Sequence, residues 1–130
     1  MYTKFYESLS KAKKNDMPWE HFTFGQALTQ AQVAEIRGAT IERGGVLHDG
    51  TRSGYKEGVE KQNHKLREYI TIENRANYPA LVELIRELQS KPIRKMIAKM
   101  VGNENNFDNS YVRLEVLNDT EGFWLKPHCD

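Results

Sequence analysis

The last twenty residues, 111–130, decide the fold of this chain, and they begin with Tyr111-Val-Arg-Leu-Glu-Val-Leu-Asn118. Val112, Leu114 and Val116 alternate with polar or aromatic residues in this run, which predicts a half-buried β-strand. Asn118-Asp-Thr-Glu-Gly122 has the composition of a turn. Phe123-Trp-Leu-Lys126 is rich in aromatic residues and predicts a second strand, so the two runs together predict a hairpin.

Pro127, His128 and Asp130 follow the second predicted strand directly. Proline has no amide donor, so Pro127 favours a strand end or an edge position. Extended backbone places His128 and Asp130 on one face, together with Trp124 and Lys126. Imidazole and carboxylate are two of the three ligands in the 2-His-1-carboxylate sites of non-haem Fe(II). His128 and Asp130 are therefore candidate metal ligands, and no catalytic side chain is identified.

The segment Gly122-Phe-Trp-Leu-Lys-Pro-His128-Cys-Asp130 resembles the glycine, four residues and Pro-His-x-Asp of the 2-oxoglutarate/Fe(II)-dependent oxygenases, in particular their prolyl-hydroxylase-like branch. The preceding order is also similar, with a strand at Tyr69–Ile72, two helical stretches and then the hairpin. The resemblance implies an α+β fold, the N-terminal half of a double-stranded β-helix (jelly roll), with helices packed on an antiparallel sheet and an incomplete barrel. It also implies Fe(II) on His128 and Asp130, 2-oxoglutarate as cosubstrate, and hydroxylation of an unactivated C–H bond.

The chain departs from the family pattern in two ways. Family members carry a second ligand histidine many residues later, and then an Arg or Lys for the far carboxylate of 2-oxoglutarate, whereas this sequence stops at Asp130. Many prolyl-hydroxylase-like members have a Tyr shortly before the glycine, where this chain has Asn118 and Asp119, which argues against a prolyl substrate. We therefore expect residues 1–130 to be one truncated, oxygenase-like domain that is inactive by itself.

The segment 41–62 contains five glycines and few large apolar residues, which predicts a long loop. Such loops are functional or disordered, and this one either lines or covers the substrate entrance or is simply mobile. His48, Asp49 and Arg52 are polar groups that could contact a substrate, and the sequence does not distinguish them from solvent-exposed side chains. Neither His48 nor the remaining histidines, His21 and His64, have a spacing that predicts a replacement metal ligand.

Composition excludes several classes of protein. The 130 residues, 38% of them hydrophobic, suit one small globular domain. A formal net charge of +1 gives no electrostatic footprint for nucleic acid or for an anionic membrane. The single Cys129 excludes an intrachain disulfide, and residues 1–6 lack the apolar core of a signal peptide. No apolar run approaches the ~18 residues that a membrane span needs, so we expect a cytoplasmic protein.

The N-terminal third predicts a helix, a strand and a second helix. Apolar positions 5, 9 and 12 predict a surface helix whose solvated face carries Lys11, Lys13 and Lys14. Residues 18–24 alternate and predict a short strand. Thr29 is the expected N-cap of a helix over 30–37. The inner side of this helix is expected to hold its apolar residues, Ala31, Val33, Ala34 and Ile36.

The run Arg67-Glu-Tyr-Ile-Thr-Ile72 is rich in β-branched and aromatic residues and predicts a strand. Two amphipathic helices are predicted between this strand and the hairpin. Pro79 suits the first turn of one helix, whose apolar stripe runs through Leu88 before Ser90-Lys-Pro92 ends it. The second helix is expected from Pro92 to about Val101, closed by Gly102. Its basic residues are expected on a solvated face: Lys91, Arg94, Lys95 and Lys99.

Three functions from different classes remain open. The first is an oxygenase fragment or subunit, and the second is a non-catalytic interaction domain on the same scaffold. The third is a DNA-binding regulator, because Leu28–Ile36 looks like the opening helix of a helix-turn-helix motif. The glycines that follow and the near-neutral charge disfavour that third function. Half a β-helix leaves strand edges open, so we expect a homo-oligomer that covers residues 111–126. The substrate, whether a protein side chain, a free amino acid or a small metabolite, is not identified.

Overall fold

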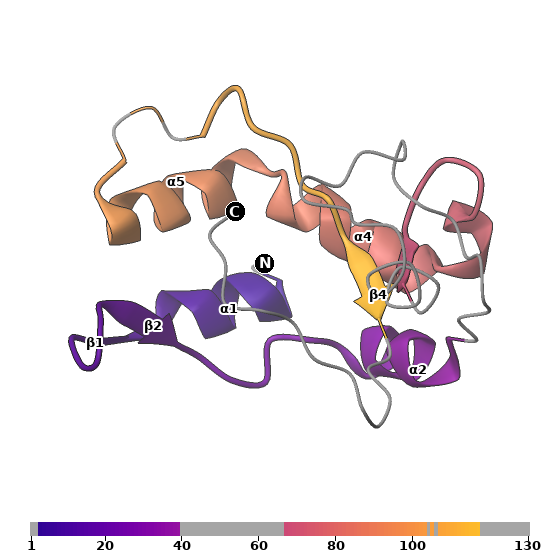
Figure 1. Ribbon diagram of the computed structural model, residues 1–130, viewed down its shortest axis with the longest axis horizontal. Helices are drawn as coiled ribbons and strands as arrows, with labels where there is room; N and C mark the ends of the chain where they lie inside the picture. The colour runs from indigo at the N-terminus through magenta and orange to yellow at the C-terminus, as the bar shows by residue number, and fades with distance from the viewer. Residues whose placement is uncertain (1–2, 40–66, 104, 106, 118–130) are drawn as a thin grey trace, which may run out of the picture.

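The computed structural model describes residues 3–39, 67–103, 105 and 107–117. These residues form an α+β structure, as predicted (Figure 1). Its helices are α1 (Lys4–Ser10), α2 (Gln30–Gly38), the short 3-10 helix η1 (Arg75–Asn77), α4 (Pro79–Leu88) and α5 (Lys91–Val101). Its strands form two antiparallel pairs, β1 (Lys13–Asn15) with β2 (His21–Thr23) and β3 (Arg67–Tyr69) with β4 (Glu115–Leu117). The described strands do not close into a barrel, and the expected hairpin partner of β4, residues 123–126, lies outside the described residues.

The main hydrophobic core lies where the β3–β4 pair packs on α4. Val116 of β4, 7% exposed, contacts a cluster formed by Tyr78, Leu81 and Leu84. Full burial of a leucine side chain contributes roughly 1.5–3 kcal/mol, so Leu81 and Leu84 fix the inner face of α4. The strand predicted from Tyr111 starts later, because β4 covers only Glu115–Leu117. The predicted alternation is confirmed, since Val116 is buried and Val112 and Leu114 are half-buried.

The strand predicted over Arg67–Ile72 is present but ends early, because β3 stops at Tyr69. β3 pairs Glu68 with Val116, and the last ladder contact is the Ile70 amide, which donates to the Leu114 carbonyl at 2.9 Å. Asn74 then turns the backbone, because its buried side chain accepts from the Thr71 amide at 2.8 Å and donates to the Tyr69 carbonyl at 2.8 Å. These two bonds override the strand propensity of the β-branched residues up to Ile72, which is 77% exposed.

α2 begins at the predicted cap but presents a different face to the protein. Thr29 Oγ1 accepts from the Gln32 amide at 3.2 Å, and Gln32 Oε1 accepts from the Thr29 amide at 2.9 Å, which is a capping box. The predicted apolar inner side is wrong, because Ala31, Ala34 and Ile36 are exposed. Gln32 is buried instead, and its Nε2 donates to the Ala80 carbonyl at 3.4 Å.

α4 obtains its N-terminal cap from α2. Pro79 begins the helix and Tyr78 provides no side-chain cap, so the first-turn amides need another acceptor. Glu35 provides it: Oε1 accepts from the Ala80 amide at 2.7 Å and Oε2 from the Leu81 amide at 2.8 Å. A carboxylate at this end also interacts favourably with the helix dipole. The polar inner side of α2 is therefore explained by its role as the N-terminal cap of α4.

α5 follows α4 after the turn at Ser90, and both ends of the prediction are confirmed within one residue. Ile93 and Ala98 are its buried residues. Gly102 adopts the left-handed conformation, with φ 71°, and its amide donates to the Ala98 carbonyl. Glycine adopts this conformation without steric cost, which is why the helix ends there.

The N-terminal helix is shorter than predicted. α1 ends at Ser10, and Lys13 and Lys14 belong to β1, whose register places Lys13 opposite Thr23 and Lys14 opposite Phe22. The expected helical basic cluster is therefore wrong, because pairing with β2 replaces helical bonding after Ser10. Both lysine side chains remain solvent-exposed, as predicted. None of the described helices combines the length and the apolar character that crossing a bilayer requires.

Candidate functional site

The predicted metal ligands, His128 and Asp130, lie outside the described residues, as do the loop at 41–62 and His64. His21 is the one described histidine. Its Nδ1 lies 2.8 Å from the Trp19 carbonyl, and its ring packs 6.3 Å from the Trp19 ring. Within the described ranges no group of three or more His, Cys, Asp or Glu side chains could hold a metal ion.

β4, the last described strand before the predicted ligands, is contacted along one edge and through its side chains. β4 is hydrogen-bonded along one edge to β3, and its Val116 side chain enters the core on α4. On the other face, the Arg113 guanidinium lies 5.2 Å from the ring centre of Tyr69, a cation–π distance. The last described strand is thus tied to both β3 and α4.

A cluster of polar side chains ties β3 to the start of α4. The Tyr78 hydroxyl donates to Glu68 Oε2, and Asn74 Nδ2 donates to Glu68 Oε1 at 3.3 Å. Burial, then the hydrogen bond and charge of Glu68, and last the charge of Glu35 raise the pKa of Tyr78 to about 12. The phenol therefore stays protonated at neutral pH and acts as a donor. The Tyr78 hydroxyl and the Asn74 amide thus tie Glu68 of β3 to the residues that precede α4.

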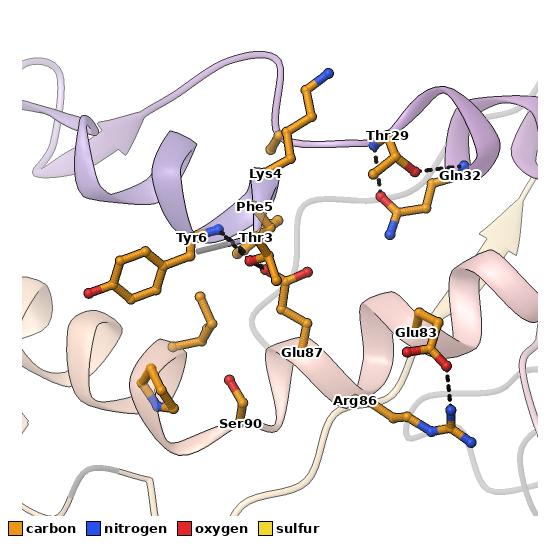
Figure 2. Close-up of a pocket in the computed structure, with 13 residues that line it drawn as sticks. Thr3, Lys4, Phe5, Tyr6, Thr29, Gln32, Glu83, Arg86, Glu87 and Ser90 are labelled. Carbon is orange, nitrogen blue, oxygen red and sulfur yellow. Dashed lines mark hydrogen bonds and ion pairs between the residues drawn. The ribbon is translucent and has the colours of Figure 1, made fainter. Parts of the chain in front are cut away.

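A groove of about 580 Å³ runs between α1 and the turn that joins α4 to α5 (Figure 2). We call it the α1 groove and define it by the residues that matter below, Phe5, Tyr6, Glu87, Ser90, Pro92 and Ile93. Phe5 is held by an edge-to-face contact with Phe24, at 5.7 Å between ring centres. Figure 2 shows the Glu87 side chain pointing from α4 toward the start of α1.

Glu87 is the half-buried carboxylate of the α1 groove. Its Oε1 accepts from the Tyr6 amide at 3.3 Å and from the Thr3 hydroxyl. Burial raises the pKa of the Glu87 carboxyl above its ordinary value, and the hydrogen bond from the Tyr6 amide offsets part of that rise. Glu83 and Arg86, which also line the groove, form an exposed ion pair with each other.

A second cavity, of about 520 Å³, adjoins the basic side of α5. Arg94 was expected on a solvated face, but it is half-buried and binds the chain that returns toward β4. Its Nη1 donates to the Phe107 carbonyl at 3.1 Å and to the Asp108 carbonyl at 3.4 Å, and its Nη2 donates to the Ser110 carbonyl at 2.7 Å. Lys91 and Lys95 line the same cavity and are exposed, as predicted.

Sequence reasoning missed Glu35, Glu68 and Glu87 as interior acceptors. The sequence carried one usable signal, since a helix that starts with Pro79 after an aromatic residue has no local side-chain cap. That signal reveals the need for an acceptor but not its identity, because Glu35 is 45 residues away from Ala80.

Comparison of the chain with protein-family models, with curated proteins and with solved structures finds no match to any of them.

Proposed function

We propose that this chain belongs to a 2-oxoglutarate- and Fe(II)-dependent dioxygenase in which His128 and Asp130 are protein ligands to iron. The observation that carries the proposal is the register of Gly122, Pro127, His128 and Asp130, because an isolated His-x-Asp would mean little. The jelly-roll identity of the fold belongs to the same proposal.

The described elements support the proposal by their order and packing. β4 precedes the His-x-Asp segment, pairs antiparallel with β3 and packs on α4. The helices α4 and α5 fill the sequence between these two strands. Helices packed on an antiparallel sheet are what the resemblance implies for the part of the domain that comes before the metal ligands.

The donor set fits the metal. Imidazole nitrogen and carboxylate oxygen are the ligand types of mononuclear Fe(II) sites that leave positions open for other molecules. Bound iron and 2-oxoglutarate would supply the oxidising power for C–H hydroxylation. For their part, His128 would offer a neutral ring nitrogen and Asp130 a charged oxygen. Two protein ligands hold a divalent ion weakly, so the direct test is metal binding and not turnover.

The test is Mn²⁺ binding by the full chain, with the EPR signal of free Mn²⁺ as the readout. Mn²⁺ accepts the same nitrogen and oxygen donors as Fe(II) and does not oxidise in air. His128→Ala and Asp130→Ala should each weaken Mn²⁺ binding by at least about tenfold, the lower end for disturbing a metal site. Added 2-oxoglutarate should tighten binding in the unmodified chain, because a keto acid chelates the same ion.

His21→Ala is the matched control, since it removes an imidazole whose nearest polar contact is the Trp19 carbonyl. It should bind Mn²⁺ as the unmodified chain does. Equal binding by all three variants would contradict the proposal. If Mn²⁺ also left unfolding and assembly unchanged, the alternative of a non-catalytic interaction domain on the same scaffold would be preferred.

A further inference from the structure

We propose that the α1 groove binds a small organic ammonium ion with an apolar body, and that Glu87 supplies the counter-charge. This inference rests on the described residues around Glu87 and is independent of the iron ligands at 128 and 130. It assigns to the chain a ligand site that the predicted oxygenase chemistry does not use.

The first argument is the unused bonding capacity of Glu87. A carboxylate offers about four lone-pair positions on two oxygens. Both hydrogen bonds of Glu87, from Tyr6 and Thr3, fall on Oε1. Oε2 accepts no hydrogen bond from the part of the chain that the structure describes. The Glu87 carboxylate is partly withdrawn from water. A hydrogen-bond donor that reaches Oε2 would therefore stabilise its charge more than the same donor would stabilise an exposed carboxylate.

The charge of Glu87 is not neutralised by any cationic side chain among the described residues. Among the described residues, no Lys or Arg lies within ion-pair distance of Glu87. Arg86 is paired with Glu83 instead, and Figure 2 shows the Lys4 ammonium pointing away from Glu87. The groove therefore holds one partly buried negative charge, Glu87, whose nearest donors are the uncharged groups of Tyr6 and Thr3.

The third argument is the shape and lining of the site. A volume of about 580 Å³ falls within the range of ~300–1,000 Å³ that is typical of small-molecule pockets. Phe5, Pro92 and Ile93 provide apolar surface, and an aromatic ring such as that of Tyr6 attracts a cation held over its face. Ser90 does not cap α5 with its hydroxyl, so this group remains a further polar contact beside Glu87.

These features select the chemical class of the ligand. Of the two carboxylates that line the groove, Glu83 is paired with Arg86, and Glu87 alone does not supply the six or more oxygen ligands that Ca²⁺ takes. An anionic ligand would be repelled by Glu87. An ammonium group attached to an aliphatic or aromatic body satisfies both the charge and the apolar surface.

The experiment is an NMR titration of the ¹⁵N-labelled full chain with benzylammonium, benzyl alcohol and benzoate. The three probes share one ring and differ in charge. Benzylammonium should shift the amide signals of Tyr6 and Ser90 and bind about tenfold more tightly than benzyl alcohol, the factor expected for one charge-assisted contact. Benzoate should bind most weakly. Equal affinity for benzylammonium and benzyl alcohol would overturn the proposal.

Glu87→Gln is the decisive variant, because its amide oxygen can still accept from Tyr6 while the charge is removed. It should lose the tenfold preference for benzylammonium and keep its affinity for benzyl alcohol. Glu7→Gln removes an exposed carboxylate of α1 that does not line the groove and should keep the preference. His128→Ala should also keep it, which separates this site from the proposed iron site. If Glu87→Gln does not fold, the test is which amide signals of the unmodified chain shift with benzylammonium. Shifts confined to residues outside α1 and the α4–α5 turn would overturn the proposal.

Discussion

The carboxylate of Glu35 accepts hydrogen bonds from the amides of Ala80 and Leu81, which lie 45 and 46 residues further along the chain. Arg94 and Glu68 also form hydrogen bonds with other segments. Arg94 donates to carbonyls within residues 107–110, and Glu68 accepts from Tyr78 and Asn74. Each is a charged residue type that is mostly exposed in proteins. Here each one satisfies backbone or side-chain groups on a different element.

Glu35→Ala should lower the free energy of unfolding by about 1–3 kcal/mol, because two first-turn amides of α4 lose a charged acceptor. The control is Gln30→Ala, which changes an exposed residue in the first turn of the same helix. Urea unfolding followed by far-UV circular dichroism measures both. A loss in Glu35→Ala no larger than in Gln30→Ala would show that water caps α4 equally well.

The raised pKa of Tyr78 predicts how the free energy of unfolding depends on pH in the alkaline range. Its pKa is about 12 in the folded chain, against an ordinary value of about 10 in the unfolded chain. Between these values the folded state keeps a proton that the unfolded state has lost, so stability falls as pH rises. The contribution of the protonated Tyr78 phenol to stability is complete below about pH 10 and disappears as pH passes through about 12.

Tyr78→Phe should therefore be less stable than the unmodified chain at pH 9, and the difference should shrink between pH 10 and 12. Urea unfolding at a series of pH values gives this difference directly. A difference that stays constant up to pH 12 would mean that the phenol is not held protonated by burial and Glu68.

At the scale of elements, the helix ends differ in how they use glycine. Gly102 lies beyond the end of α5 in the left-handed conformation, whereas Gly38 is the last residue of α2 and has no positive φ. A Cβ added at either position would meet nothing within 4 Å. Substitution by alanine thus reports the backbone conformation alone, without a steric term from neighbours.

Gly102→Ala should cost about 1–2 kcal/mol, because an L side chain is strained in the left-handed region. Gly38→Ala should be neutral or stabilising by up to about 1 kcal/mol, because alanine has less backbone freedom to lose in the unfolded chain. Thermal unfolding of the two variants in parallel measures the contrast. Equal effects would indicate that the end of α5 rearranges to accept alanine.

At the scale of the whole molecule, the described strands are short and the sheets have two strands each. A two-stranded sheet is marginal without further pairing or packing, and here α4 covers one face of the β3–β4 pair. We propose that the chain forms a homo-oligomer that covers residues 111–126. Tyr111 is 70% exposed and Leu117 is 41% exposed in the described part of this segment.

Light scattering at high protein concentration should show a dimer or a larger assembly, and Leu117→Lys should shift it toward the monomer. A lysine on a strand edge opposes pairing with another chain. Ile72→Lys is the control, since Ile72 is 77% exposed but lies in the turn after β3, outside residues 111–126. A monodisperse monomer of the unmodified chain would contradict the proposed assembly.

Local sequence patterns were enough to predict the α+β class, the position of α2, α4 and α5, and the ends of these helices. Thr29, Pro79 and Gly102 act within one or two turns of where they stand, so their effect is visible in a local pattern. The candidate ligands His128 and Asp130 also came from sequence, and they stay a prediction because they lie outside the described residues.

Three features depend on long-range packing and could not be predicted. They are the pairing of β4 with β3, the polar inner side of α2, and the position of Glu87 in a groove beside Tyr6. The last contact joins residues 81 positions apart, and nothing in the sequence near Glu87 indicates Tyr6 as its partner. A charged residue on an amphipathic helix has the same local pattern whether it faces water or a distant backbone amide. The difference arises from the free energy of satisfying buried polar groups, which depends on the whole packed molecule.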